Sequence, residues 1–298
     1  YNHLVMSTQV NGNFDGDFPF RTTFPIGPEA RQLESIPTLP ALKPPLIRNP
    51  VVLGARVVSR MAWAGLGFLL YGLQLPAALL GRPGWAAQLM TLASAVALRA
   101  LGVQVVVDDS QPSEKPGTPL VHIFNHRSPC DGLVIQAVLK LPGLTTAQLH
   151  LKWVLPGYAA AARNAGSAVL DHRQPQSRLA GLMSASTLLR DHGEIMIAPN
   201  GSLVTPIEER VSSSPWMLAQ HYGGSIVPWV FRYEGLDGTV GARYKPLRLL
   251  LNRLTAPLGT IHCRRGRSSD LQLPEDPRDR DGFSCAVQEY YREKQDQR

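Results

Sequence analysis

Residues 120–140 read Leu-Val-His-Ile-Phe-Asn-His-Arg-Ser-Pro-Cys-Asp-Gly-Leu-Val-Ile-Gln-Ala-Val-Leu-Lys, and this stretch decides the fold. Its first five residues form an apolar run typical of a strand, and residues 132–140 form an amphipathic run typical of a helix. Ser128 followed by proline is a helix start signal, with serine as N-cap and proline at the first helical position. The stretch therefore predicts a strand that delivers His126 to the beginning of a helix, with Asp131 one turn above it.

His126 and Asp131 allow two interpretations. Histidine is the side chain best suited to take a proton near neutral pH, and a neighbouring carboxylate can hold its ring. The same spacing also fits a capping box, in which Asp131 satisfies a backbone N–H at the helix start and His126 is a polar loop residue. Spacing alone does not choose between a catalytic pair and a cap, so the neighbouring motifs must decide.

Short β-branched runs alternate with helical runs around this stretch, which is typical of a sheet built from βαβ units. The expected strands are Val103–Val107, Leu120–Phe124, Gln148–Val154, Ala168–Leu170, Glu194–Ala198, Ile226–Phe231 and Gly259–Cys263. The expected helices are Asp131–Lys140, Tyr158–Asn164, Gln176–Asp191 and Ser214–Tyr222. We therefore expect an α/β domain at residues 102–270, with a mixed, largely parallel central sheet flanked by helices.

The segments outside this domain differ from it in composition. Residues 1–50 are rich in Pro, Gly, Asn and Thr and predict a disordered or extended leader. Residues 61–81 carry no charge and approach the roughly 20 residues that cross a bilayer. A second apolar run follows and arginines flank both, so residues 51–101 predict a membrane-associated two-helix hairpin, spanning or re-entrant. The alternative is a buried core hairpin of a soluble protein. Residues 271–298 predict a charged C-terminal helix or tail with one apolar face.

Composition limits the class of partner. The 298 residues carry a formal net charge of +7, which suits an anionic partner such as a phospholipid surface, an acyl-carrier thioester or nucleic acid. The basic run at residues 262–267 lacks interleaved aromatic residues and fits a membrane surface equally well, so we expect no nucleic-acid partner. Three cysteines show neither zinc-site spacing nor an even disulfide framework, which indicates a reducing compartment. No Gly-x-Ser-x-Gly elbow, Walker loop or dinucleotide fingerprint occurs in the sequence.

The sequence NHRSPCD at residues 125–131 resembles the first motif of the glycerolipid acyltransferase family, lysophosphatidate acyltransferase type, in which Asn-His-x-x-x-x-Asp follows a strand. The resemblance extends over roughly residues 55–265. It implies that His126 is the general base that deprotonates an acceptor hydroxyl, and that Asp131 orients and charges the imidazole. It also implies a reaction with no metal, no cofactor and no covalent intermediate, because the acyl thioester, acyl-CoA or acyl-carrier protein, is already activated.

Gly166 to Arg173 resembles the second family motif, Gly-x-x-x-x-Asp-Arg, with one histidine inserted. The resemblance implies that Arg173 binds the phosphate of the acceptor, since a guanidinium offers a planar fork of donors to phosphate oxygens. Lys152 is a weaker candidate for the same contact. The alternative for Arg173 is a solvated loop arginine.

The run Ala-Pro-Asn-Gly-Ser-Leu at residues 198–203 resembles the third family motif, Phe-Pro-Glu-Gly-Thr-Arg. It implies acceptor contacts from Asn200, Gly201 and Ser202. Asn200 stands where the family has glutamate and Leu203 where it has arginine, so one acidic contact and one cation for phosphate are absent. An amide still has both a donor and an acceptor, and can bind a neutral hydroxyl head group. Pro-Asn-Gly is also a good turn, and Asn-Gly-Ser is also a glycosylation sequon.

Val227 and Pro228 match a fourth family motif and are assigned to the wall of an acyl-chain site. Together, these motifs predict a membrane-bound, 1-acylglycerol-3-phosphate O-acyltransferase-like enzyme of phospholipid biosynthesis. Its expected partners are the lipid bilayer, a lysophospholipid or related glycerolipid acceptor and an acyl thioester donor, with the active site facing the cytoplasm. A phospholipid–lysophospholipid transacylase and a catalytically weak lipid-binding protein are the alternatives, and the oligomeric state stays open.

Overall fold

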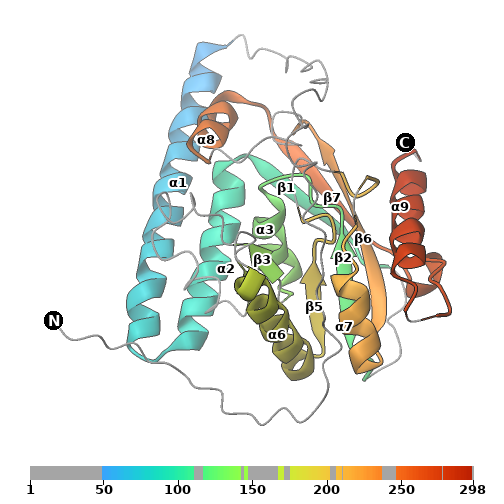
Figure 1. The fold of residues 1–298 in the computed structure, drawn as a ribbon. Coiled ribbons are helices and arrows are strands. Elements are labelled where there is room, and N and C mark those ends of the chain that lie inside the picture. The colour runs from blue at the N-terminus through green and yellow to red at the C-terminus, as the bar shows by residue number, and fades with distance from the viewer. Residues whose placement is uncertain are drawn as a thin grey trace. The chain divides into compact units, whose positions relative to one another are not determined.

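The computed structural model describes residues 49–110, 117–141, 144–146, 167–170, 175–201, 206–209, 211–236, 246–276 and 278–296. All of them belong to one compact unit, residues 41–298. The helices are α1 (Pro50–Leu79), α2 (Pro83–Ala100), α3 (Asp131–Val134), the π-helix η2 (Ile135–Leu139), α6 (Pro175–His192), α7 (Ser214–Tyr222), α8 (Pro246–Thr255), the 3-10 helix η3 (Ser268–Asp270) and α9 (Arg280–Asp296) (Figure 1). The strands are β1 (Val103–Asp108), β2 (Leu120–Phe124), β3 (Leu144–Thr146), β4 (Ala168–Leu170), β5 (Glu194–Ile197), β6 (Ser225–Glu234) and β7 (Gly259–Arg265).

The central sheet has the order β1-β7-β6-β2-β5. The pairs β1–β7, β2–β6 and β2–β5 are parallel and β6–β7 is antiparallel, so the predicted mixed, largely parallel sheet is confirmed. β3 and β4 instead pair with each other in a second, two-stranded sheet. The strand predicted at Gln148–Val154 and the helix predicted at Tyr158–Asn164 lie outside the described residues. Helix α8 was not predicted from the sequence.

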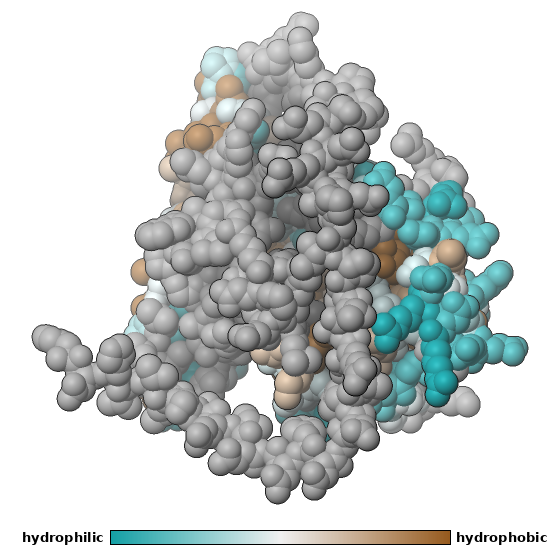
Figure 2. Space-filling model, viewed as in Figure 1, coloured by the Kyte–Doolittle hydropathy of each residue, from teal (hydrophilic) through white to brown (hydrophobic). Residues whose placement is uncertain are grey.

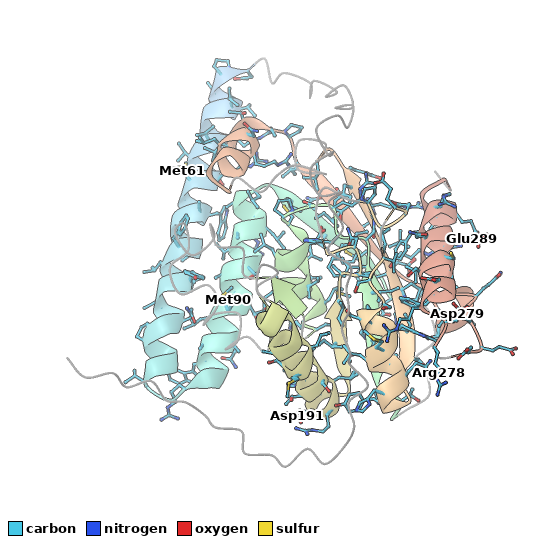
Figure 3. All side chains as sticks on the ribbon, in the orientation of Figure 1. Met61, Met90, Asp191, Arg278, Asp279 and Glu289 are labelled. Atoms are coloured by element: carbon cyan, nitrogen blue, oxygen red, sulfur yellow. The ribbon has the colours of Figure 1, made fainter. Side chains whose placement is uncertain are left out.

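Two hydrophobic clusters cover the two faces of the sheet. Val121 and Ile123 of β2 face one cluster, and Phe124 faces the other, as the alternation of a strand requires. Helix α9 belongs to the first cluster and supplies four fully or nearly fully buried residues: Phe283, Val287, Tyr290 and Tyr291. Its opposite side is charged, with Arg278, Asp279 and Glu289 at or near it (Figure 3). The C-terminal helix is therefore part of the core, and its predicted apolar face is the part that packs.

Helix α1 buries one narrow side and exposes many of its large apolar residues. Arg60, Gly67 and Gln74 are buried at intervals of seven, along the side where α1 packs on α2. A side chain at position 67 would meet Val96 Cγ1 at 3.4 Å, so the two helices approach closely there. The exposed large apolar residues of α1 are Val51, Val52, Val58, Met61, Leu66, Phe68, Leu69 and Leu73. Large apolar residues on the outside of a helix are the reverse of the pattern of a soluble core helix.

Two buried arginines join this hairpin to the rest of the unit. Arg60 of α1 donates through Nη1 to main-chain oxygens at the C-terminal end of α8: Arg253, Leu254 and Ala256. Arg253 donates to the main-chain oxygens of Leu101, Gly102, Gly235 and Pro257. Cations match the carbonyl groups that a helix leaves unpaired at its C-terminus. Gly102 has φ +63° and lies against the Arg60 guanidinium, so only glycine fits there.

Candidate functional site

The loop after β2 is anchored to β6 at the point where it leaves the sheet. The last pair between β2 and β6 is Phe124 with Trp229. Beyond it, the side chain of Asn125 continues the pairing, because its Nδ2 donates to the Phe231 main-chain oxygen at 2.8 Å and its Oδ1 accepts from the Phe231 N–H at 2.7 Å. The amide thus imitates one more residue of strand, and His126 follows directly from this anchor.

His126 and Asp131 are in direct contact. His126 Nδ1 lies 2.9 Å from Asp131 Oδ2, the carboxylate is fully buried and 26% of the histidine side chain is exposed. A carboxylate only accepts hydrogen bonds, so Nδ1 carries the proton and Nε2 is left with its lone pair. The arrangement can therefore take a proton at Nε2 and stabilise the resulting imidazolium with the buried charge.

Asp131 also stabilises the turn that leads into its own helix, although the backbone N–H groups it binds precede the helix. Its Oδ2 accepts hydrogen bonds from the backbone N–H groups of Arg127 and Ser128, each at 3.0 Å. The two interpretations of the sequence, a pair with His126 and a helix cap, therefore describe one carboxylate and do not exclude each other. The cap also rigidifies the turn that carries the histidine.

The helix that follows differs from the predicted one. It begins at Asp131, two residues later than the serine–proline signal indicates, with Cys130 at the N-cap position. Ser128 Oγ accepts from the Cys130 N–H at 3.2 Å and so stabilises the turn before the helix. After one α-turn the chain continues as the π-helix η2 and ends at Lys140, whose φ is +55°. The predicted helix Asp131–Lys140 is thus one α-turn joined to one π-turn.

Tyr233 is a site residue that the sequence analysis missed. Its hydroxyl donates to Asp131 Oδ1 at 2.9 Å from the end of β6. Burial, followed by the charge of Asp131, raises the pKa of Tyr233 well above its ordinary value, so the phenol stays protonated and acts as the donor. Alternation along β6 from Val227 through Phe231 places Tyr233 on the same face, and this period of two is the signal that could have found it.

Two thiols lie near the carboxylate. Burial raises the pKa of Cys130 and of Cys263 to about 12, and the charge of Asp131 acts in the same direction. Both thiols are therefore neutral at physiological pH. Neither cysteine has the lowered pKa that a nucleophilic thiol needs.

Asn200 is brought to the histidine from a different strand end. The residue is buried, and its Nδ2 donates to the main-chain oxygen of His126 at 2.8 Å. Gly201 follows with φ +60°, and its N–H donates to the Ala198 oxygen at 3.1 Å, so the predicted turn is present. The structure thus places Asn200 beside the loop of the His126–Asp131 pair.

The other predicted site residues are not gathered in the same way. Val227 belongs to the cluster that contains Phe124 and Cys130, which is the face of the sheet that carries the site. Pro228 is the next residue of the strand and so lies on the opposite face, where it approaches Gly266 beside Tyr290. The two therefore do not form one wall. Lys152, Arg173 and Ser202 lie outside the described residues. Within the described ranges no three His, Cys, Asp or Glu side chains gather in a way that could hold a metal ion.

Comparison with known proteins agrees with the family resemblance. Residues 104–232 match the model of the family described as Acyltransferase. The crystal structure of the 1-acyl-sn-glycerophosphate (LPA) acyltransferase PlsC from Thermotoga maritima has a similar fold, with a TM-score of 0.51 and 16% sequence identity over 82% of this chain and 97% of that chain. No curated protein sequence matches the chain. The resemblance drawn from the sequence is thereby confirmed, and Tyr233 is the first residue after the matched segment.

Proposed function

We propose that this protein transfers a fatty acyl group from an acyl thioester to a hydroxyl of a lysophospholipid or related glycerolipid, and the match of residues 104–232 to the acyltransferase family model supports this proposal. The observation that carries the proposal is the hydrogen bond from His126 Nδ1 to the buried carboxylate of Asp131. It fixes the ring in the tautomer whose Nε2 can accept a proton.

The pair supports a direct transfer. His126 Nε2 takes the proton of the acceptor hydroxyl while the hydroxyl oxygen attacks the thioester carbonyl carbon. The carbon–sulfur bond then breaks, and the imidazolium returns the proton to the leaving thiolate. Asp131 stays ionised throughout and stabilises the imidazolium between these two steps. No side chain becomes acylated, because a thioester is already an activated acyl donor.

The donor is acyl-CoA or an acyl-carrier protein. Both are anionic, and the net charge of +7 favours their approach. The two donors differ in size and in where their charge lies, so turnover with each of them separates the possibilities.

For the acceptor, we assign phosphate binding to Arg173, with Lys152 as a second cation, and head-group contact to the segment of Gly201 and Ser202. Leu203 stands where the family has a cation, so the pocket relies on fewer charges for a phosphate monoester. Arg173→Ala should raise the KM of phosphate-bearing acceptors, and Leu203→Arg should improve the use of lysophosphatidate. If the wild type already prefers lysophosphatidate strongly and Leu203→Arg changes nothing, the phosphate is held elsewhere.

A membrane location follows from α1. Among the described residues it is the one helix long and apolar enough to cross a bilayer, over Pro50–Gln74, and only 11% of its most apolar window is buried. Figure 2 shows hydrophobic surface along α1 at the left edge, and Met61 lies on that outer side in Figure 3. A lipid acceptor would reach the site from the same membrane. We assign the active site to the cytoplasmic side, where acyl thioesters are made.

Two alternatives are distinguished by one experiment. A transacylase would use the same pair with a phospholipid as donor, and the replaced residues of the third motif favour a catalytically weak lipid-binding protein. Purified protein is mixed with labelled acyl-CoA, acyl-carrier protein or phospholipid and a panel of lysophospholipids. Acyl transfer from a thioester supports the proposal, transfer only from phospholipid supports the transacylase, and binding without transfer supports the lipid-binding protein.

A further inference from the structure

The Asp131 carboxylate is held from both of its oxygens. Oδ2 accepts from His126 Nδ1 and from the N–H groups of Arg127 and Ser128. Oδ1 accepts from the hydroxyl of Tyr233 at 2.9 Å. The same hydroxyl lies 3.4 Å from the Asn125 main-chain oxygen, but its one proton goes to the nearer, charged acceptor. With donors on both oxygens, the carboxylate cannot rotate away from the histidine.

The sheet places Tyr233 at this point by register. Asn125 is bonded to both main-chain polar groups of Phe231, which fixes where β6 stands relative to the loop. Tyr233 follows two residues later, so it returns to the same face of the strand. A shift of one residue in the register of β6 would turn the Tyr233 ring to the opposite face of the sheet and separate it from Asp131. The contact is therefore set by the same pairing that sets His126.

We propose that Tyr233 is a positioning residue for the catalytic base, whose hydroxyl fixes the Asp131 carboxylate and weakens its hold on the protonated imidazole of His126. The inference rests on the proposed acyl transfer. A hydrogen bond to a carboxylate makes it less basic. Without the Tyr233 hydroxyl, Asp131 would hold the imidazolium more strongly, and a higher pH would be needed to free the base.

Two buried thiols and one arginine are the neighbouring groups that could produce the same effect. Among the described residues, Cys263 on β7 raises the pKa of Tyr233. The pKa of Cys130 is raised by the charge of Asp131 and lowered by Arg253 of α8. Burial raises the pKa of both thiols to about 12, so they do not titrate in the range where a histidine base works. If a Tyr233 variant changes the pH profile in the range where a histidine base works, the change therefore acts through Asp131 and His126.

The test uses Tyr233→Phe, which removes only the hydroxyl. Its kcat should fall about tenfold, the effect expected when one charge-assisted hydrogen bond is lost. The rising limb of kcat/KM against pH should move to higher pH. Tyr291→Phe is the matched control, because its buried hydroxyl lies 3.0 Å from the Ile123 and Trp229 oxygens and does not contact Asp131. That variant should lose stability and keep the wild-type pH profile.

Two outcomes would overturn the inference: a Tyr233→Phe profile that superimposes on the wild type, or an equal shift in Tyr291→Phe.

A second readout does not need catalysis. The ring signals of labelled His126 are followed against pH by NMR in the wild type and in Tyr233→Phe, with His126→Ala for assignment. If the wild type transfers no acyl group, the proposed function fails, yet this titration still decides the inference. A half-titration point at higher pH in Tyr233→Phe supports it, and an unchanged point contradicts it.

Discussion

Asn200 donates from its side-chain Nδ2 to the main-chain oxygen of His126 at 2.8 Å, across 74 positions of sequence. Asn200 stands where the related motif has a glutamate, and a glutamate carboxylate could not make this hydrogen bond because it has no proton to donate. The asparagine therefore supports the loop of His126 in a way that an ionised glutamate could not. A head-group contact through its other amide atom is compatible with this bond.

Replacing Asn200 with Asp tests that support. The carboxylate would face the His126 carbonyl oxygen, so the loop should shift and kcat should fall by about tenfold, the effect of losing one buried hydrogen bond and leaving its partner unsatisfied. If Asn200 acted only on the acceptor, KM would rise and kcat would stay. Steady-state kinetics with a saturating thioester donor separate the two results.

Asp131→Asn separates the charge of this residue from its role as a cap. The amide oxygen can still accept from the N–H groups of Arg127 and Ser128, and the amide nitrogen can donate to the Tyr233 oxygen. We expect a loss of stability of about 1 kcal/mol and a fall in kcat of about 10²-fold or more, because the imidazolium loses its counter-charge. Thermal unfolding and kcat are measured on the same preparation. A variant that keeps the wild-type rate would reduce Asp131 to a cap.

The exposed apolar side of α1 predicts how the protein partitions. The wild type should stay with membranes at high salt, since apolar insertion is not screened as surface charge is. Phe68→Glu together with Leu69→Glu places charges where we expect lipid, at a cost of about 3 kcal/mol each near the bilayer centre, and should release the protein. Met183→Glu, at an exposed apolar position of α6, is the control and should not. Release of the wild type by salt alone would leave only electrostatic attachment. Sedimentation with liposomes measures membrane binding of the wild type, the double variant and the Met183→Glu control.

A second histidine–carboxylate contact predicts how stability depends on pH. Trp229 Nε1 donates to His122 Nδ1 at 3.1 Å, so the His122 proton sits on Nε2, 3.3 Å from Glu194 Oε2. The hydrogen bond from His122 lowers the pKa of Glu194 below its ordinary value of 4.5. The stabilisation is therefore present above pH 4.5 and lost as pH falls through the lowered pKa.

Glu194→Gln should flatten this dependence, because an amide accepts the same hydrogen bond but does not titrate. Denaturant unfolding from neutral pH to below pH 4.5 should show a smaller acid-induced loss of stability in the variant than in the wild type. Parallel curves would mean that Glu194 does not contribute to acid sensitivity.

The elements found from the sequence are those with strong local signals. Strand β2 and helix α6 follow from uninterrupted periodicity, and His126 and Asp131 follow from a short motif. Helix α8 was overlooked although Leu247, Leu250, Leu251 and Leu254 have the spacing of an amphipathic helix. The inward turn of its Arg253 to main-chain oxygens is a contact that no local rule identifies.

The remaining parts of the site depend on contacts between distant strands. The predicted range Asp131–Lys140 has the observed start, but the serine–proline signal indicated a start two residues earlier, because Cys130 and not Ser128 stands at the N-cap position. Asn125, Asn200 and Tyr233 reach the loop through pairing over 74 to 106 positions. Register of this kind is decided by the packed sheet, so a single sequence does not display it.

The central claim is that His126 is the base of an acyl transfer, and the rate of acyl transfer by wild type and His126→Ala tests it most directly. Purified proteins are given a labelled acyl thioester and lysophospholipid acceptors, and acylated lipid and free thiol are both quantified. We predict equal amounts of the two products from the wild type and a rate lower by about 10²–10⁴-fold in a folded His126→Ala protein, the usual contribution of general-base catalysis. A loss below about tenfold, or a wild type that forms no acylated lipid from any thioester, would contradict it.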